Sequence, residues 1–528
     1  MVPGRNQKRS RALTLAAYSV LGLSLIPLIG LYLASGAEPP LFSSPPLSAE
    51  AVSILLVRTL ALALAVSVIS LVLGTWLAWC DTRFRFSGHR FVQIAAILPL
   101  AIPSYLLAGV IREVMAPRGT IGGMLGRTDS FSGFWPAVIV LSLSCTPYVH
   151  LLVRSTLISQ SSALDEAARL LGAKPWRRFW KITMPTLRPA WAFSLVIVAF
   201  YTISDFGAVA VLDCEVLTWA LYQNRHTPRD VVGLGVLIIV VVVPTMTFIR
   251  WIHGRGQGNA SIGVARSRQR EEPSVKSRIL MYLGYSLVIV PGFIVPTSVI
   301  VGWVFSGLQS GMQWHGLLGQ ILNTFYYTGL GAILTLSASL LIAWYVARSE
   351  KGVAGVEYGV YLTSGLPGIL IAVGIFYVLL AVKSGFGGLV ENWSLALESI
   401  GGFLLLGYVM RFLSEGYAAL KPGIVALDRR VEEAATTLGA SAWRRFREIS
   451  LPALSPSLVA ATVLLVVAIA KELPITLLLT PLGQQTLAYR IFDAQQEGAL
   501  PESGVPALLL LMMVFAVQIG LRERSRNG

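Results

Sequence analysis

The sequence EAARLLGAKPWRRFWKITMPTLRP at residues 166–189 returns 267 residues later as EAATTLGASAWRRFREISLPALSP at residues 433–456. The two stretches align without a gap and match at 14 of 24 positions. Each is a basic, polar interruption between long apolar runs. This duplication predicts two structural repeats. Each repeat has a polar loop outside the apolar segments to which a partner can bind.

The composition indicates an integral membrane protein. The 528 residues are 55% hydrophobic and 13% charged, whereas an ordinary soluble protein has about 25% charged residues. A membrane-spanning helix needs ~20 apolar residues, and the first predicted span is long enough to be a retained helix instead of a cleaved signal. The predicted spans are 12–34, 54–79, 92–116, 134–158, 187–212, 231–253, 279–306, 320–347, 357–382, 400–420, 456–482 and 504–522.

The placement of the positive charge predicts the topology. If the chain starts in the cytoplasm and the spans alternate, 33 of the 42 Lys and Arg residues fall in cytoplasmic tails, loops and helix ends, with the group at residues 411–447 counted among them. The positive-inside rule produces such a bias. We therefore expect both termini and both repeated loops in the cytoplasm. The net charge of +15 then reflects contact with a lipid bilayer and not with nucleic acid.

A linker divides the chain into two parallel halves. Residues 254–278 are basic, rich in Gly and Ser, and lack apolar periodicity, so they read as a cytoplasmic linker between a first half (1–253) and a second half (279–528). Further matches include Arg58-Thr59-Leu60 with Asn323-Thr324-Phe325, and prolines Pro99 and Pro367 in the third spans. Because each half has six spans, the repeats enter from the same side. The predicted fold class is an all-α membrane protein of twelve transmembrane helices in two parallel six-helix repeats.

The repeated loop has the composition of a helical elbow. Residues 163–171 favour a short helix, which Gly172 ends, because a left-handed terminus is cheapest for glycine. Pro175 suits the first turn of the next helix, and Ser441 can cap its counterpart. Two helices joined by a fixed elbow form a rigid lever. The alternative, a hairpin copied by gene fusion and kept only for packing, leaves the shared Glu and Arg residues unexplained.

The motif resembles the EAA loop of ATP-binding-cassette importer permeases. Its marks are Glu-Ala-Ala, a Gly six residues after the Glu, and Ile-x-x-Pro ending 13 residues after the Gly. The resemblance implies a type I importer permease whose loops dock on an ATPase subunit. The residues that it assigns to ATPase coupling are Glu166, Ala167, Ala168 and Gly172 in the first half and Glu433, Ala434, Ala435 and Gly439 in the second.

The same resemblance implies a location in the bacterial inner membrane and a set of partners. The sequence contains no G-x-x-x-x-G-K-[ST] phosphate loop, so a separate subunit is expected to hydrolyse ATP, and the chain is expected not to be an enzyme. Two loops imply two copies of that cytoplasmic ATPase. A periplasmic substrate-binding protein is expected to deliver the cargo to the opposite face.

Two acids follow the loops at the same offset. Asp205 and Glu472 are again 267 residues apart, and the adjacent Gly207 and Pro474 can break the helices there. Intramembrane carboxylates usually face a polar cavity or a partner, so both are candidates for the translocation pathway or an outer gate. The alternative places Asp205 at an exposed helix end and pairs Glu472 with Lys471.

The sequence around these two acids resembles that of fused iron(III) importer permeases. The stretches are SDFGAVAVL and KELPITLLLTPLGQQTLAYRIFD. Related permeases carry thiamine or phosphonate-type substrates, and these stay open as alternatives. Asp205, Glu472 and Tyr201 carry oxygen ligands, yet no metal site or cofactor is assigned, and the three cysteines and five histidines lack metal-ligand spacing. Two other classes are an ion-gradient-driven transporter of twelve spans, which leaves the duplicated loop unexplained, and a membrane-embedded enzyme or scaffold, for which no catalytic constellation exists.

Overall fold

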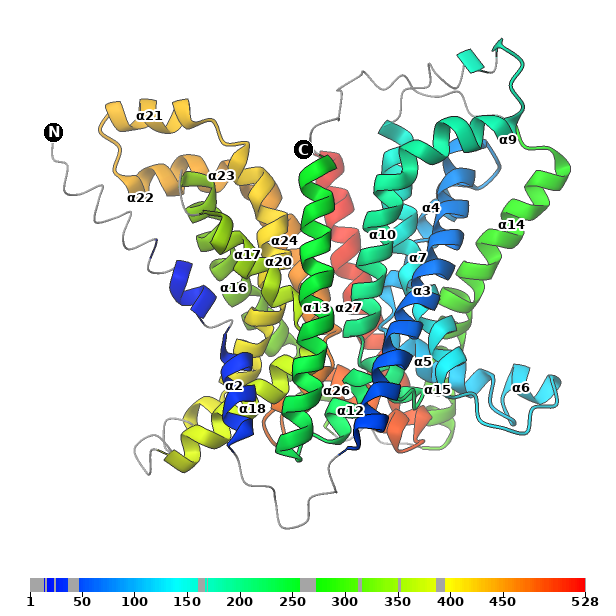
Figure 1. The fold of residues 1–528 in the computed structure, drawn as a ribbon, viewed down its shortest axis with the longest axis horizontal. Coiled ribbons are helices and arrows are strands. Elements are labelled where there is room, and N and C mark those ends of the chain that lie inside the picture. The colour runs from blue at the N-terminus through cyan, green and yellow to red at the C-terminus, as the bar shows by residue number, and fades with distance from the viewer. Residues whose placement is uncertain are drawn as a thin grey trace.

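The protein is a bundle of long helices whose two repeated loops lie at one end (Figure 1). The computed structural model describes residues 14, 17–22, 25–36, 47–159, 167–168, 170–256, 272–311, 316–349, 353–385 and 395–527. Within these ranges the chain forms helices and turns and no β-strand. We call the end that carries the repeated loops the loop end.

The first half contains long helices interrupted by short ones. Its helices are α2 (Ile26–Ser35), α3 (Ala49–Arg83), α4 (His89–Ala95), η1 (Leu98–Ala101), α5 (Ser104–Val114), α6 (Thr120–Met124), α7 (Phe134–Ser159), α9 (Pro175–Arg178), η2 (Phe179–Thr183), α10 (Met184–Ser204), α11 (Gly207–Val211), α12 (Leu217–Gln223) and α13 (Pro228–Gly256).

The second half repeats this order. Its helices are α14 (Val275–Ile289), η3 (Val290–Ile294), α15 (Val295–Gln309), α16 (Leu317–Arg348), α17 (Val353–Gly365), α18 (Gly368–Gly385), α20 (Gly402–Val425), α21 (Arg429–Thr437), α22 (Ala442–Arg445), η4 (Phe446–Ser450), α23 (Leu451–Ala453), α24 (Ser455–Ala470), α25 (Pro474–Leu479), α26 (Leu487–Gln496) and α27 (Leu500–Asn527).

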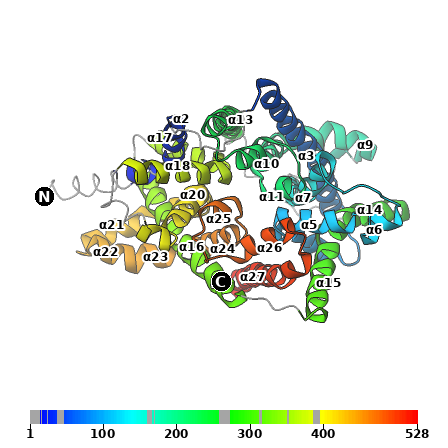
Figure 2. The ribbon, with the colours of Figure 1, turned by 90° about the horizontal axis from the view of Figure 1, so that it is seen from below.

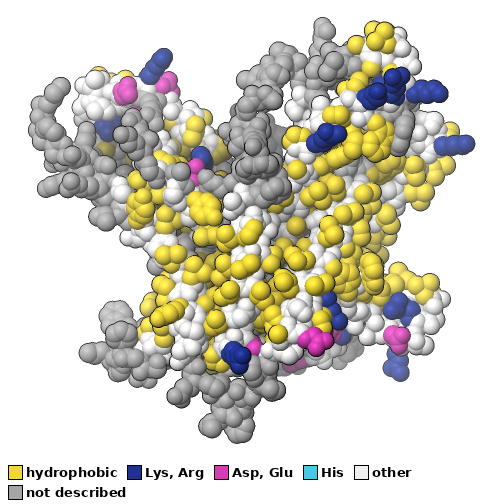
Figure 3. Space-filling model, in the orientation of Figure 1, with side chains coloured by type: hydrophobic (Ala, Val, Ile, Leu, Met, Phe, Trp, Pro, Cys, Tyr) yellow, Lys and Arg dark blue, Asp and Glu magenta, His cyan; other side chains and the backbone are white. Residues whose placement is uncertain are grey.

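The helices are long and apolar enough to cross a membrane. Among the described residues, nine helices pass this test on their own, and the number reaches 12 if each of three bent helix pairs counts as one span. These segments match the twelve spans predicted from hydropathy. On the face shown in Figure 3, apolar side chains fill the middle of the molecule, and Lys and Arg gather toward the loop end. A multi-pass all-α membrane fold is therefore confirmed.

Four predicted spans are not single straight helices. The third spans of the two halves bend by 99° and 96° between their two helices. Pro103 and Pro367 stand at these bends, directly before α5 and α18. A proline lacks the N–H needed to continue a helix and restricts the residue before it. The sequence comparison paired Pro99 with Pro367. In the structure, Pro103 takes the position at the bend that corresponds to Pro367.

Two more predicted spans end earlier than hydropathy indicates. The predicted span 187–212 breaks after Ser204, and the predicted span 456–482 breaks after Ala470. Short helices α11 and α25 follow each break, as the positions of Gly207 and Pro474 favoured. The predicted linker is also shorter at both ends, because α13 continues to Gly256 and α14 begins at Val275. Residues 257–271 of the linker lie outside the described residues.

The first helices of the two halves are exchanged. α2 packs on α18 of the second half, and α14 and α15 pack on α3 and α5 of the first half (Figure 2). At the first contact the backbones of Gly30 and Gly374 meet so closely that a Cβ on either would clash. At the second, the Tyr285 hydroxyl donates to the Leu77 carbonyl at 3.2 Å. Each half is therefore completed by a helix of the other.

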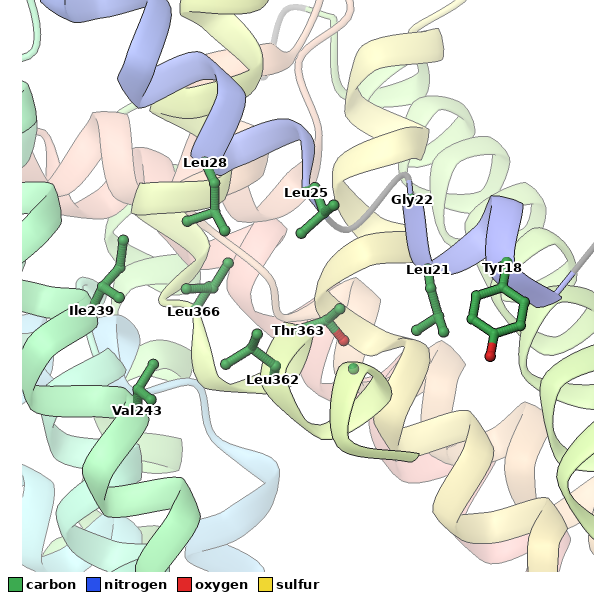
Figure 4. A pocket seen from close by; sticks show the side chains of 11 residues that line it. Tyr18, Leu21, Gly22, Leu25, Leu28, Ile239, Val243, Leu362, Thr363 and Leu366 are labelled. Carbon is green, nitrogen blue, oxygen red and sulfur yellow. The ribbon is translucent and has the colours of Figure 1, made fainter. Parts of the chain in front are cut away.

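An apolar pocket lies beside the first exchanged helix. It has a volume of about 280 Å³ and lies between α13, α17 and the residues that lead into α2 (Figure 4). Leu28, Ile239, Val243, Leu362 and Leu366 surround it. Its lining is suited to the hydrocarbon part of a membrane and offers no charged group to a polar cargo.

Candidate functional site

The second repeated loop is a helix, a glycine elbow and a second helix. α21 begins at the cap residue Asp428, whose carboxylate accepts from the Arg430 N–H at 2.9 Å. Ser441 caps the next helix, with its hydroxyl oxygen accepting from the Arg444 N–H at 3.2 Å. The predicted cap at Ser441 is confirmed. These side chains satisfy backbone donors that a helix start would otherwise leave unpaired.

The two elbows have the same backbone geometry. Gly172 has φ +75° and Gly439 has φ +80°, both in the left-handed region that glycine adopts at little cost. After each glycine, the next N–H donates back to the second alanine of the motif, to Ala168 in one loop and to Ala435 in the other, at 3.0 Å in both. The predicted left-handed glycine is confirmed in both halves, whereas most of the helix predicted at 163–171 lies outside the described residues. Glu166 lies outside the described residues.

Each loop then enters the membrane bundle through a π-turn. The Met184 N–H bonds to the Phe179 carbonyl and the Leu451 N–H to the Phe446 carbonyl, five residues back in both cases. The next residue is a proline each time, Pro185 or Pro452. A wider turn before a proline accommodates a ring that would clash within a regular helix. In the second half the chain bends by a further 71° before α24.

Aromatic pairs hold both loops to the bundle. Phe179 packs edge-on against Trp79 of α3, with ring centroids 4.8 Å apart. Phe446 packs in the same manner against Trp344 of α16, at 5.6 Å. Edge-to-face pairs of this kind are favourable because the ring edge is positive and the ring face negative. Each tryptophan also lies beneath a guanidinium, of Arg83 or Arg348, within 5 Å.

An ion pair ties α21 to the same helix end. Arg348 of α16 forms a salt bridge with Glu432, the residue before the motif glutamate. Glu432 also accepts a hydrogen bond from the Ser450 hydroxyl at 3.1 Å. Because both members of this ion pair, Arg348 and Glu432, are half-buried, the pair fixes the orientation of α21 relative to α16 more firmly than an exposed pair would. Glu432 therefore connects α21 to both α16 and η4.

The outer surface of each loop is exposed. Glu433 and Ala434 are exposed, as is Ala167 at the matching position of the first loop. Leu171 and Leu438, which precede the elbow glycines, are 88% and 87% exposed. These large side chains make part of the outer surface of each loop apolar. The geometry offers two equivalent, rigidly mounted contact surfaces at one end of the bundle.

A cavity of about 730 Å³ lies between the halves. α5, α7 and α10 line it from the first half, and α18, α20 and α24 line it from the second. It extends toward the loop end as far as Ala419 and Ala460. The charged residues of its lining are Asp205, Arg411, Glu415, Lys471 and Glu472.

The structure brings the two predicted acids to this cavity and gives each a second task. One Asp205 oxygen accepts from the Ala208 N–H at 2.9 Å, and the other accepts from the Ser104 hydroxyl at 2.6 Å. Glu472 accepts from the Ile475 N–H at 3.1 Å and from the Thr476 N–H at 3.2 Å. Each acid thus caps the short helix that follows the break in its span. Asp205 is half-buried and Glu472 is 8% exposed, so the alternative of an exposed helix-end acid is wrong.

Sequence reasoning missed Arg411 and Glu415. Arg411 was counted with the cytoplasmic flank, because positive charge near a span end is the ordinary topological signal. In the structure it lies within α20 and lines the cavity, four residues before Glu415. The available signal was the Arg411-x-x-x-Glu415 spacing, which places an ion-pairing couple on one helix face inside an apolar run.

The far end of the cavity is closed by pseudo-symmetric contacts. The Thr59 hydroxyl accepts from the Leu217 N–H at 3.0 Å, and the Thr324 hydroxyl accepts from the Leu487 N–H at 2.9 Å. These bonds seat α12 and α26 across the bundle end opposite the loops. Between them the ring of Phe206 lies 6.0 Å from that of Phe492 in the other half. The cavity thus extends toward the loops, and the contact between Phe206 and Phe492 joins the halves at the opposite end of the bundle.

No metal site accompanies the cavity in the part of the chain that the structure describes. No three His, Cys, Asp or Glu side chains there are grouped to hold an ion. The cysteines Cys80, Cys145 and Cys214 are free and buried. Asp205, Glu472 and Tyr201 all line the cavity.

Comparison with known proteins gives matches across both halves. A family model described as "Binding-protein-dependent transport system inner membrane component" matches residues 70–255 and 339–521. An Fe(3+)-transport system permease protein of Haemophilus influenzae is 26% identical over 484 residues, which cover 87% of this chain and 90% of that protein. A putative ferric transport system permease protein of the same species is 27% identical over 75% of this chain and 66% of its own length. The sulfate transport system permease protein of Escherichia coli K12 is 34% identical over 29% of this chain and 54% of that protein.

Proposed function

Because the chain belongs to the family of binding-protein-dependent transport system inner membrane components, we propose that it is the translocation subunit of an ATP-driven importer for iron(III). The proposed cargo rests on the alignment with an Fe(3+)-transport permease, which covers 87% of this chain and 90% of that relative. The sulfate permease resembles only 29% of the chain, so it supports the transport class more than the cargo.

The two repeated loops are proposed to dock one ATPase subunit each. The proposed coupling residues are Glu166, Ala167, Ala168 and Gly172 in the first loop and Glu433, Ala434, Ala435 and Gly439 in the second. The exposed Leu171 and Leu438 and the matching elbows support this role. ATP hydrolysis then belongs to the two docked subunits, and this chain performs no covalent chemistry.

The loop end is proposed to face the cytoplasm, together with both termini. The basic residues of the loops support this orientation through the positive-inside rule. A periplasmic substrate-binding protein then delivers cargo to the end that α12 and α26 close. The cavity, which extends toward the loop end, corresponds to the inward-facing state, and Asp205 and Glu472 are proposed to lie on the translocation pathway.

Transport by the reconstituted system tests the proposed cargo. The permease, its ATPase and its binding protein are placed in proteoliposomes, and uptake of radioactive iron(III), sulfate and thiamine is measured with and without ATP. We expect ATP-dependent uptake of iron(III) alone. Uptake of sulfate or thiamine in place of iron would overturn the proposed cargo, and uptake by the chain without an ATPase would overturn the transport class.

Charge reversal tests the coupling role. Glu166→Lys together with Glu433→Lys should abolish co-purification of the ATPase while the permease still inserts. Glu448→Lys is the matched control, because this exposed acid lies on the second loop outside the motif, paired with Arg444. Normal co-purification with the double variant would refute the coupling role of the two glutamates.

A further inference from the structure

The two walls of the central cavity differ in charge. The second half contributes Arg411, Glu415 and Lys471 to the lining. The offset of 267 residues that relates the two loops assigns Ser144, Tyr148 and Ser204 to the same positions in the first half, and these three residues also line the cavity. One wall is therefore charged where its counterpart carries hydroxyl groups.

The charged residues lie where the two walls meet. Arg411 and Glu415 of α20 line the same cavity as Tyr148 of α7 in the first half. Lys471 reaches across the interface, and its ammonium donates to the Leu100 carbonyl of η1 at 3.0 Å. A lysine ammonium has three N–H donors, so this single bond leaves others for a second acceptor. These contacts place the cationic groups at the meeting of the halves, where a cargo must pass.

The acids of the cavity already accept hydrogen bonds from the protein. The two oxygens of Asp205 accept from the Ser104 hydroxyl and from the Ala208 N–H. Glu472 is occupied by two backbone donors and by the Thr476 hydroxyl at 3.2 Å. Glu415 follows Arg411 by one helical turn in α20 and lines the same cavity as Lys471. Arg411 and Lys471 are the residues of this lining that carry N–H donors on a positive charge.

We propose that Arg411 and Lys471 bind the oxygens of a small oxyanion in this cavity, with Glu415 as the internal partner of both cations when the cavity is empty. A guanidinium offers a planar fork of N–H donors that matches an oxyanion, and an ammonium adds a compact positive charge. Charged groups within a membrane are costly and mark substrate pathways.

The oxyanion has two possible sources: free in solution, or coordinated to iron(III) and carried with it. This inference rests on the proposed function as an importer permease and narrows the chemical form of its cargo. An iron(III) ion whose charge is neutralised by coordinated oxyanions fits the cationic wall.

Equilibrium binding tests the site directly. Radioactive inorganic phosphate is titrated into the purified permease–ATPase complex in lipid nanodiscs. We expect saturable binding to the unmodified complex and at least a tenfold weaker affinity in Arg411→Gln with Lys471→Gln. Lys421→Gln is the matched control, because Lys421 is also a cation of α20 but pairs with Glu357 away from the cavity. Equal affinity in the double variant and the unmodified complex, or no phosphate binding at all, would overturn the proposal.

If the double variant does not assemble, the phosphate affinity of Lys471→Gln is compared with that of Lys471→Arg. Only the arginine keeps the positive charge, so only the glutamine variant should bind phosphate more weakly. Transport in proteoliposomes then separates the two sources. Co-transport of labelled phosphate and iron in a fixed ratio identifies a metal-borne oxyanion, and phosphate uptake without iron identifies a free one. Iron uptake without phosphate that is unchanged in the double variant would also overturn the proposal. Failure of the proposed function gives a different result, because the unmodified complex would then take up no iron. The phosphate-binding measurement would still test the oxyanion site in that case.

Discussion

Replacing the elbow glycines Gly172 and Gly439 with alanine should weaken ATPase docking through the backbone alone. A Cβ built on either glycine meets no atom within 4 Å, so the substitution introduces no steric clash with another element. Both residues have φ near +75° to +80°, and the left-handed conformation costs an L-residue roughly 1–2 kcal/mol. The cost of each substitution is therefore about 1–2 kcal/mol.

This cost is measured either as a loss of ATPase affinity or as a loss of permease stability. If a loop becomes ordered as it docks, the ATPase affinity falls by a factor of about 5–30 for each alanine, the equivalent of 1–2 kcal/mol. If the elbow is already formed in the free permease, the same free energy is lost from its stability instead. ATPase affinity is measured by titration in nanodiscs, and stability by thermal unfolding of the permease alone.

Asparagine provides the control, because it tolerates the left-handed conformation better than other residues with a side chain. Gly439→Asn should lie between the unmodified permease and Gly439→Ala, and Gly439→Val should be the most affected because its side chain is β-branched. Equal affinity and equal stability in the glycine and alanine proteins would refute the reasoning, since the strain would then have no consequence.

The other predictions concern the contacts that seat the loops, the far end and the pathway. Thr59→Val and Thr324→Val each leave a buried N–H unpaired, so each should destabilise the permease by about 1–3 kcal/mol in thermal unfolding, whereas the serine variants should not; unchanged unfolding would contradict the seating role. Trp344→Leu and Phe446→Leu should show a coupling of about 0.5–1.5 kcal/mol in a double-mutant cycle of stability, and additive losses would show that the rings do not interact. Asp205→Asn with Glu472→Gln should slow iron uptake and leave ATPase association intact; unchanged uptake would reduce both acids to helix caps.

Hydropathy and local chemistry predicted much of this fold. Apolar length predicted the twelve spans. The glycine of each loop predicted the elbow, and Ser441 predicted a helix cap in the second loop, since both features depend on residues close in sequence. The breaks after Ser204 and Ala470 were likewise signalled by Gly207 and Pro474. The acids Asp205 and Glu472 were found because a charge in an apolar run is conspicuous.

The features that sequence reasoning missed depend on packing between distant segments. Hydropathy reports how much of a segment is apolar but not its direction, so the bends at Pro103 and Pro367 read as straight spans. Arg411 was assigned to the flank because the same residue type serves topology and pathway. The exchange of α2 and α14 between the halves has no local signal, because it rests on contacts such as Gly30 with Gly374.

The helix exchange has a consequence for how the protein is made. When the first six spans have left the ribosome, the seam that α14 and α15 fill on α3 and α5 is still empty, so that half cannot close its packing. Joining the halves in one chain keeps the seventh span at high effective concentration beside the waiting seam. Fusion therefore does more than fix an equal number of the two halves: it delivers to each half, during synthesis, the helix that completes it.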